Sequence, residues 1–148
     1  MAIVDVTTEI VIRRPRDEVA AFASDPANAT AWYRNITSAS MRTPPPLTVG
    51  SRIDFVARFL GRTLMYTYEV AELEPGRRLI QRTADGPFAM ETTYTWDDVP
   101  DGTRMTLRNR GEPSGFASVA APAMAAAMRR ANRNDLRRLK ELVESDPS

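Results

Sequence analysis

Residues 50–109 restrict the possible folds most, because five runs with strand-like alternation follow one another there and are separated by short turns. The alternation collects large side chains on one side of each run, as in Leu64, Tyr66, Tyr68 and Val70, and in Phe88, Met90, Thr92, Tyr94 and Trp96. A sheet with so many rings on one face must cover that face with a helix or bend around a cavity. The choice between these two outcomes decides what the protein does.

The turns between these runs have sequences that favour tight reversals. Gly61-Arg62 suits a hairpin, Pro75-Gly76 a type II turn, and Asp101-Gly102 a primed turn. We therefore expect successive strands to pair as neighbours in an antiparallel meander.

The flanking segments supply one strand, two short helices, a weaker strand and a long helix. Residues 3–12 alternate like a strand with one buried face, and residues 36–42 form the weaker strand. Pro15 suits the first position of a short helix that ends near residue 24, and Asp25 suits the cap of a second one that runs through Trp32. Residues 122–144 predict a long amphipathic helix whose inward stripe contains Met128, Asn132, Leu136, Leu139 and Val143.

The composition excludes several kinds of chemistry. The chain has no cysteine and no histidine, which removes thiolate and imidazole catalysis and zinc sites built from these ligands. The strand acids have the parity of the solvent face, so no carboxylate pair points inward: Asp5, Glu9, Asp54, Glu69 and Glu91. We expect no metal and no cofactor. Asp135 borders the inward stripe of the long helix and is the one acid that could reach the edge of the cavity. We expect it instead to be a surface group that pairs with a nearby arginine.

Length and charge bear on organisation and partners. The 148 residues fit a single domain, 1–148, and the formal net charge of +1 gives no overall attraction to nucleic acid. No apolar run is long enough to span a membrane, so we expect a cytoplasmic protein with no integral membrane segment. The arginines on the outer side of the long helix indicate a solvated face, and without interleaved aromatics they do not predict nucleic-acid binding. The sequence is compatible with a homodimer.

Several short segments follow one another in a recognisable order: residues 15–19 with Phe22, residues 25–28 leading to Trp32, residues 49–52, residues 68–70 with 74–79, and residues 134–140. In these segments and in its order of elements, the sequence resembles the START-like (SRPBCC) superfamily, polyketide cyclase/dehydrase type. The resemblance implies an α+β helix-grip fold, in which a curved seven-stranded antiparallel sheet wraps around a long C-terminal helix. It also implies an elongated apolar cavity between the sheet and that helix. By the same likeness, the Trp32-Tyr33-Arg34 corner and residues 111–121 would lie near the cavity mouth.

On this fold the aromatic face points at the helix, which yields a set of candidate ligand-binding residues. They are Trp32, Phe55, Phe59, Tyr66, Tyr68, Met90, Thr92, Tyr94, Trp96, Met105, Asn109, Met124, Met128 and Asn132. The rings either pack the core or contact a ligand, and the polar groups either satisfy one another or orient a ligand.

Three functions follow from these observations. The leading hypothesis is the binding of a hydrophobic small molecule, such as a lipid or polyketide, in the cavity. The alternative is a cyclase or dehydratase in which tyrosine and asparagine groups position and polarise the substrate. The third is a protein-interaction or stress-response module whose cavity is filled by side chains.

Overall fold

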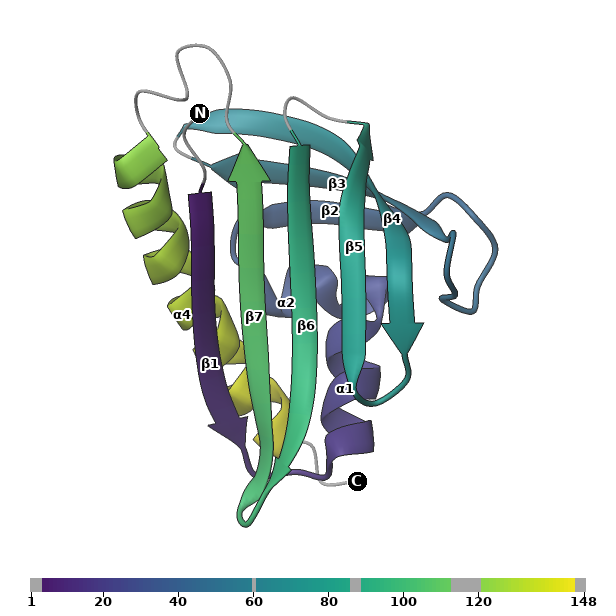
Figure 1. Ribbon diagram of the computed structural model, residues 1–148, viewed down its shortest axis with the longest axis vertical. Helices are drawn as coiled ribbons and strands as arrows, with labels where there is room; N and C mark the ends of the chain where they lie inside the picture. The colour runs from purple at the N-terminus through teal and green to yellow at the C-terminus, as the bar shows by residue number, and fades with distance from the viewer. Residues whose placement is uncertain (1–3, 60, 86–88, 113–120, 146–148) are drawn as a thin grey trace.

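A computed structural model of the chain describes residues 4–59, 61–85, 89–112 and 121–145. The strands are β1 (Val4–Ile12), β2 (Ile36–Met41), β3 (Arg52–Phe59), β4 (Arg62–Glu74), β5 (Arg78–Asp85), β6 (Ala89–Val99) and β7 (Gly102–Glu112). The helices are α1 (Arg16–Ser24), η1 (Pro26–Asn28), α2 (Ala29–Trp32) and α4 (Ala121–Ser145). The predicted sequence of elements is therefore confirmed, including the two short helices and the long C-terminal one (Figure 1).

The strands form one antiparallel sheet in the order β1-β7-β6-β5-β4-β3-β2. From β2 to β7 each strand pairs with its neighbour in sequence, as the turn sequences predict, and β1 joins the far edge beside β7. Gly61 and Gly76, with φ angles of 76° and 77°, occupy the left-handed region that these turns require. The meander is therefore set by local turn chemistry, whereas the placement of β1 depends on a contact across the chain.

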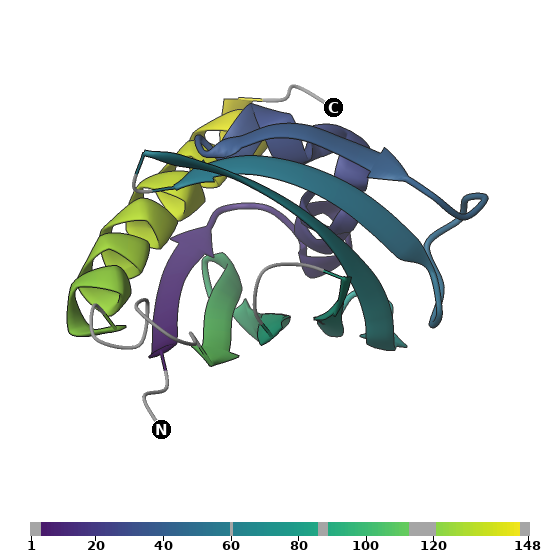
Figure 2. The same ribbon diagram turned by 90° about the horizontal axis from the view of Figure 1, so that it is seen from above.

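The sheet is strongly curved, and β4 forms the bend. Residues 62–69 of β4 pair with β3, and residues 67–74 pair with β5, so this one strand belongs to both halves of the sheet. Its pairing with β5 has two register shifts, and irregularities of this kind bend a strand and increase its twist. Figure 2 shows the result: β2, β3 and part of β4 arch over β1, β7 and β6, which leaves a concave space between the two halves.

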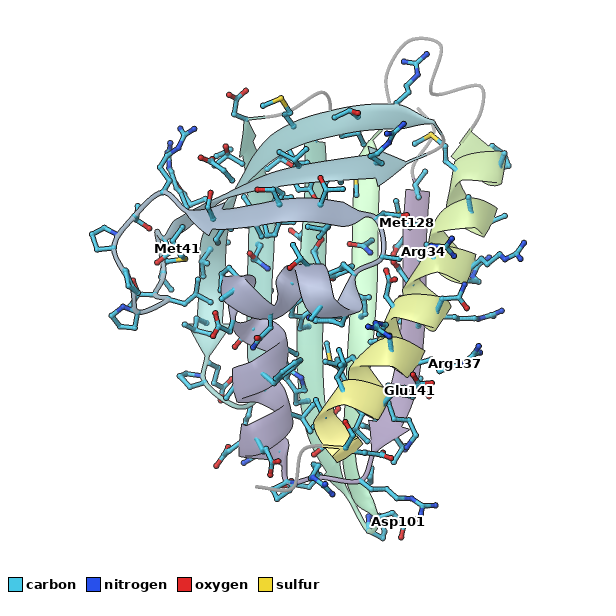
Figure 3. All side chains as sticks on the ribbon, turned by 180° about the vertical axis from the view of Figure 1, so that it is seen from behind. Arg34, Met41, Asp101, Met128, Arg137 and Glu141 are labelled. Atoms are coloured by element: carbon cyan, nitrogen blue, oxygen red, sulfur yellow. The ribbon has the colours of Figure 1, made fainter. Side chains whose placement is uncertain are left out.

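Helix α4 lies on the concave side and packs along β1. Leu136 and Leu139 are 0% exposed and belong to the same core cluster as Trp96 and Met105. Arg137, the residue after Leu136, points away from the sheet, as Figure 3 shows. The stripe expected from the sequence is therefore the buried face of the helix.

The short helices close one end of the concave space. Pro15 is the N-cap of α1 rather than its first residue, because the helix begins at Arg16. The Asp25 side chain accepts a hydrogen bond from the backbone N–H of Ala27, which confirms its predicted capping role. Val19 and Ala23 of α1 are buried against the sheet.

The convex face of the sheet carries cross-strand ion pairs. They are Asp5–Arg108 at 2.6 Å, Glu91–Arg82 at 2.6 Å, Glu69–Arg52 at 3.0 Å and Asp54–Arg42 at 3.1 Å. The predicted outward parity of these acids is confirmed. Exposed pairs of this kind stabilise a fold only slightly, so their main effect is to keep this face polar. Within the described residues, no helix is both long enough and apolar enough to cross a bilayer.

We expect Leu136→Ala to lower the free energy of unfolding by about 2–5 kcal/mol, because it leaves a cavity where α4 meets the sheet. Urea unfolding followed by circular dichroism measures the change. The matched control is Arg137→Ala, one residue further along α4 on its exposed face. Equal effects of the two substitutions would contradict the packing described above.

Candidate ligand-binding site

A pocket of about 150 Å³ lies between the concave face of the sheet and α4. Its walls come from β2 to β7, from α2 and the residues that follow it, and from α4, while the end of α1 and the start of η1 border it. The predicted site residues on its wall are Trp32, Phe55, Tyr66, Tyr68, Met90, Thr92, Tyr94, Asn109, Met124, Met128 and Asn132. The concave space is thus neither empty nor completely filled by side chains.

Other predicted site residues lie elsewhere. Trp96 and Met105 are buried in the core and do not line the pocket. Strand parity places them on the correct face, but parity cannot tell which part of a strand lies under the packed section of the helix. The side chain of Phe59 and residues 113–120 lie outside the described part of the chain.

An aromatic cluster forms the wall on β3 and β4. The ring centroid of Phe55 lies 5.3 Å from that of Tyr66 and 5.6 Å from that of Tyr68, and the two tyrosine rings are 5.1 Å apart. Contacts of this kind make the wall rigid and apolar. They also explain the modest volume, because the rings occupy much of the concave space.

Tyr68, Thr92 and Asn109 form a buried hydrogen-bonded chain. The Tyr68 hydroxyl lies 2.9 Å from Thr92 Oγ1. The Thr92 hydroxyl in turn donates to Asn109 Oδ1 at 2.6 Å. Burial raises the pKa of Tyr68 to about 12, with the Thr92 hydrogen bond acting in the opposite direction. The phenol therefore stays neutral. For these residues the structure favours mutual satisfaction over free ligand-orienting groups.

Tyr94 is paired with Tyr33, a residue that was expected near the cavity mouth but was not among the candidate ligand-binding residues. The two hydroxyl oxygens are 2.5 Å apart, and the Tyr33 ring stacks on Trp32 with centroids 3.9 Å apart. Burial raises the pKa of both phenols. Tyr33 follows the last residue of α2, outside any periodic run, so no pattern marked it as inward.

Asp135 is a buried wall residue, and its expected role as a surface group was wrong. It is 4% exposed, and its Oδ1 accepts a hydrogen bond from the backbone N–H of Arg34 at 3.1 Å. Burial raises the pKa of this carboxyl to about 6, and the Arg34 hydrogen bond offsets part of that effect. Arg34 lies beside α4 (Figure 3), and it interacts with Asp135 through its backbone N–H rather than through an ion pair.

Asn132 lies one helical turn before Asp135 and is also 4% exposed. Its Nδ2 is buried without a hydrogen-bond partner among the described residues. A buried amide that lacks a partner costs free energy, so such a group on a pocket wall is suited to a ligand atom. The prediction that Asn132 faces the cavity fits this position, and its ligand-binding role remains a prediction.

Comparisons with known proteins identify a family for the sequence and solved structures with the same fold. A family-level sequence model described as "Polyketide cyclase / dehydrase and lipid transport" matches residues 4–144. No curated protein matches the sequence significantly.

Several solved structures share the fold across nearly their whole length. TTHA0849 from Thermus thermophilus has a TM-score of 0.85 at 21% identity, covering 97% of this chain and 99% of its own. The ZhuI aromatase/cyclase from Streptomyces sp. R1128 has a TM-score of 0.78 at 15% identity, covering 96% and 94%. Ginseng major latex-like protein 151 from Panax ginseng has a TM-score of 0.76 at 11% identity, covering 96% and 98%. At such identities the similarity shows the fold alone.

Asp135→Asn should stabilise the protein at neutral pH. The pKa of Asp135 in the folded protein, about 6, lies above its ordinary value of 3.8, so the folded state binds this proton more tightly than the unfolded chain. The free energy of unfolding therefore falls as the pH rises between these two values, and the whole penalty is present above the higher one. We expect a gain of about 1–3 kcal/mol at neutral pH that vanishes below about pH 4.

Urea unfolding at several pH values measures this difference. The Asn side chain retains an oxygen for the Arg34 N–H, so the substitution removes the charge and preserves the hydrogen bond. A gain that does not depend on pH would show that burial of the carboxylate is not its cause.

Proposed function

Because this chain belongs to the polyketide cyclase/dehydrase and lipid transport family and has the helix-grip fold, we propose that it binds a hydrophobic small molecule between the sheet and α4. The observation that carries the proposal is the pocket itself, whose wall is mainly aromatic and aliphatic with a few polar groups. Binding sites for small molecules have this composition. Affinity would come from burial of apolar surface, at about 25 cal/mol per Å².

The volume of the pocket limits the size of the ligand. A cavity of about 150 Å³ is comparable to one that holds a benzene molecule, and pockets for drug-sized ligands are larger. Met90, Met124 and Met128 line the pocket, and methionine side chains change rotamer at low cost. A ligand of two or more rings would therefore enter by displacing these side chains.

A cyclase or dehydratase activity is the second candidate, and Asp135 is the observation that favours it. A carboxyl group with a pKa of about 6 inside an apolar pocket is suited to proton transfer near neutral pH. Against catalysis, Tyr94 is bonded to Tyr33 and Asn109 to Thr92, so these groups do not converge on one open point. We therefore place binding first.

A protein-interaction module with a filled cavity is the least supported of the three functions. It requires that side chains fill the space between the sheet and α4, and a pocket remains there.

Filling the pocket tests the proposal. Ala131 lies on the wall, and we expect Ala131→Phe to weaken the binding of 2-methoxynaphthalene, a neutral two-ring probe, by about tenfold or more because the new ring occupies its space. Isothermal titration calorimetry measures the affinity. Ala126→Phe, on the exposed side of the same helix, is the control and should leave it unchanged. If native mass spectrometry finds no bound molecule and calorimetry finds no binding, the proposal fails.

Tyr94→Phe separates a binding protein from an enzyme. The Tyr94 hydroxyl is held by Tyr33, so its removal should change ligand affinity by less than about tenfold. The measurement compares affinity with turnover for any compound that copurifies with the protein. Lost turnover with affinity retained would favour the enzyme over the carrier.

A further inference from the structure

The charges of this protein are distributed unevenly between its surface and its pocket. The chain has 20 lysine and arginine residues, all of them lie in the described part, and none lines the pocket between the sheet and α4. Asp135, in contrast, is a buried acid on that wall. A ligand carboxylate or phosphate would therefore enter without a counter-ion and would meet a group of like charge.

We propose that this pocket selects neutral ligands carrying a hydroxyl group and excludes anions such as fatty acids, with Asp135 and Asn132 contacting the polar end of the ligand. The inference rests on the proposed binding function and adds the chemical class of the ligand. The Asp135 carboxylate can accept further hydrogen bonds. Among the described residues its only donor is the Arg34 N–H, on Oδ1, whereas a carboxylate offers about four acceptor sites.

No cation forms a salt bridge with this carboxylate in the described structure. Tyr33, after α2, and Tyr94, on β6, lie near Asp135, and their pKa values are raised mainly by burial and also by the charge of Asp135, so both phenols stay neutral. Arg34 and Arg138 line a separate hollow that also reaches Asp135, and neither forms an ion pair with it. The charge of Arg34 lowers the pKa of Asp135 less than burial raises it. A carboxylate that is buried without a salt bridge favours a neutral donor as its partner and disfavours a second anion.

Asn132 complements Asp135 from the preceding turn of the same helix. Side chains three positions apart on a helix have Cβ atoms about 5–6 Å apart, close enough for both to contact one small group. Asn132 Nδ2 has no partner among the described residues and can donate, while the Asp135 carboxylate can only accept. A single hydroxyl accepts from the first and donates to the second, and an ether oxygen or a carboxylate cannot do both.

The size of the charge effect decides whether such selection is measurable. Two like charges about 5 Å apart at an effective dielectric constant of about 20 weaken binding by about 100-fold or more. Loss of hydration without a counter-ion adds to this. No arginine of α4 lines the pocket, and Arg137 points away from it in Figure 3, so these side chains do not supply the missing counter-ion.

Two pairs of naphthalene probes test the inference by isothermal titration calorimetry at about pH 8, where Asp135 is ionised. The pair 2-naphthol and 2-methoxynaphthalene tests the hydroxyl, and we expect the naphthol to bind about tenfold more tightly. The pair 2-acetylnaphthalene and 2-naphthoate, matched in size, tests the charge, and we expect the anion to bind about 100-fold more weakly.

Variants assign these effects to the two residues. Asp135→Asn should raise the affinity for 2-naphthoate by at least about tenfold and reduce the advantage of 2-naphthol. Glu141→Gln removes the same charge from the exposed face of α4 and should change neither ratio (Figure 3). Asn132→Leu removes a donor from which both 2-naphthol and 2-methoxynaphthalene can accept, so it should weaken both probes and leave their ratio nearly unchanged.

The wild-type protein offers a test that needs no variant. Lowering the pH from about 8 to about 5.5 protonates much of Asp135, so the affinity for 2-naphthoate should rise while that for 2-acetylnaphthalene stays constant. Equal affinities for the neutral and anionic probes at about pH 8 would overturn the selectivity and leave the binding function standing. If none of the four probes binds, the proposed function fails, and the inference fails with it.

Discussion

The packing of α4 against one part of the concave sheet is the interaction on which the rest of this structure depends. Leu136 and Leu139 complete a core with Trp96 and Met105, and that contact fixes the helix. Because β4 bends and pairs with both halves of the sheet, the concave side of the sheet is larger than one helix can fill. The pocket is the part of the concave face that α4 spans with smaller or more adaptable side chains, such as Ala131 and Met128.

The polar groups of the interior fall into two kinds, and the difference bears on function. Tyr68, Thr92 and Asn109 satisfy one another, and the phenol of Tyr94 is paired with Tyr33, so these groups mainly stabilise the wall. The second kind includes two groups on α4: the Asn132 amide has a buried nitrogen without a partner among the described residues, and Asp135 keeps acceptor capacity. A group that the fold leaves incompletely satisfied beside a cavity is where a ligand gains most from hydrogen bonding.

The charged groups also differ between the convex face of the sheet and the pocket. The acids and arginines of the convex face pair across strands and are exposed, so they have little influence on the interior. The described wall of the pocket holds no basic side chain, so the near balance of charges in the whole chain conceals a locally acidic interior. This separation is the physical basis of the proposed preference for a neutral ligand over an anionic one.

The sequence alone predicts the strands, their inward faces and the turns, because alternation and turn chemistry act within a few residues; Tyr66, Tyr68 and Tyr94 were placed correctly for this reason. It also determined the absence of imidazole and thiolate chemistry. Three-dimensional packing was needed to show that Trp96 fills the core while Tyr94 lines the pocket, that Tyr33 turns inward, and that Asp135 is buried. These outcomes depend on the rotation and depth of α4 against a bent sheet, a property of distant segments that no local pattern records.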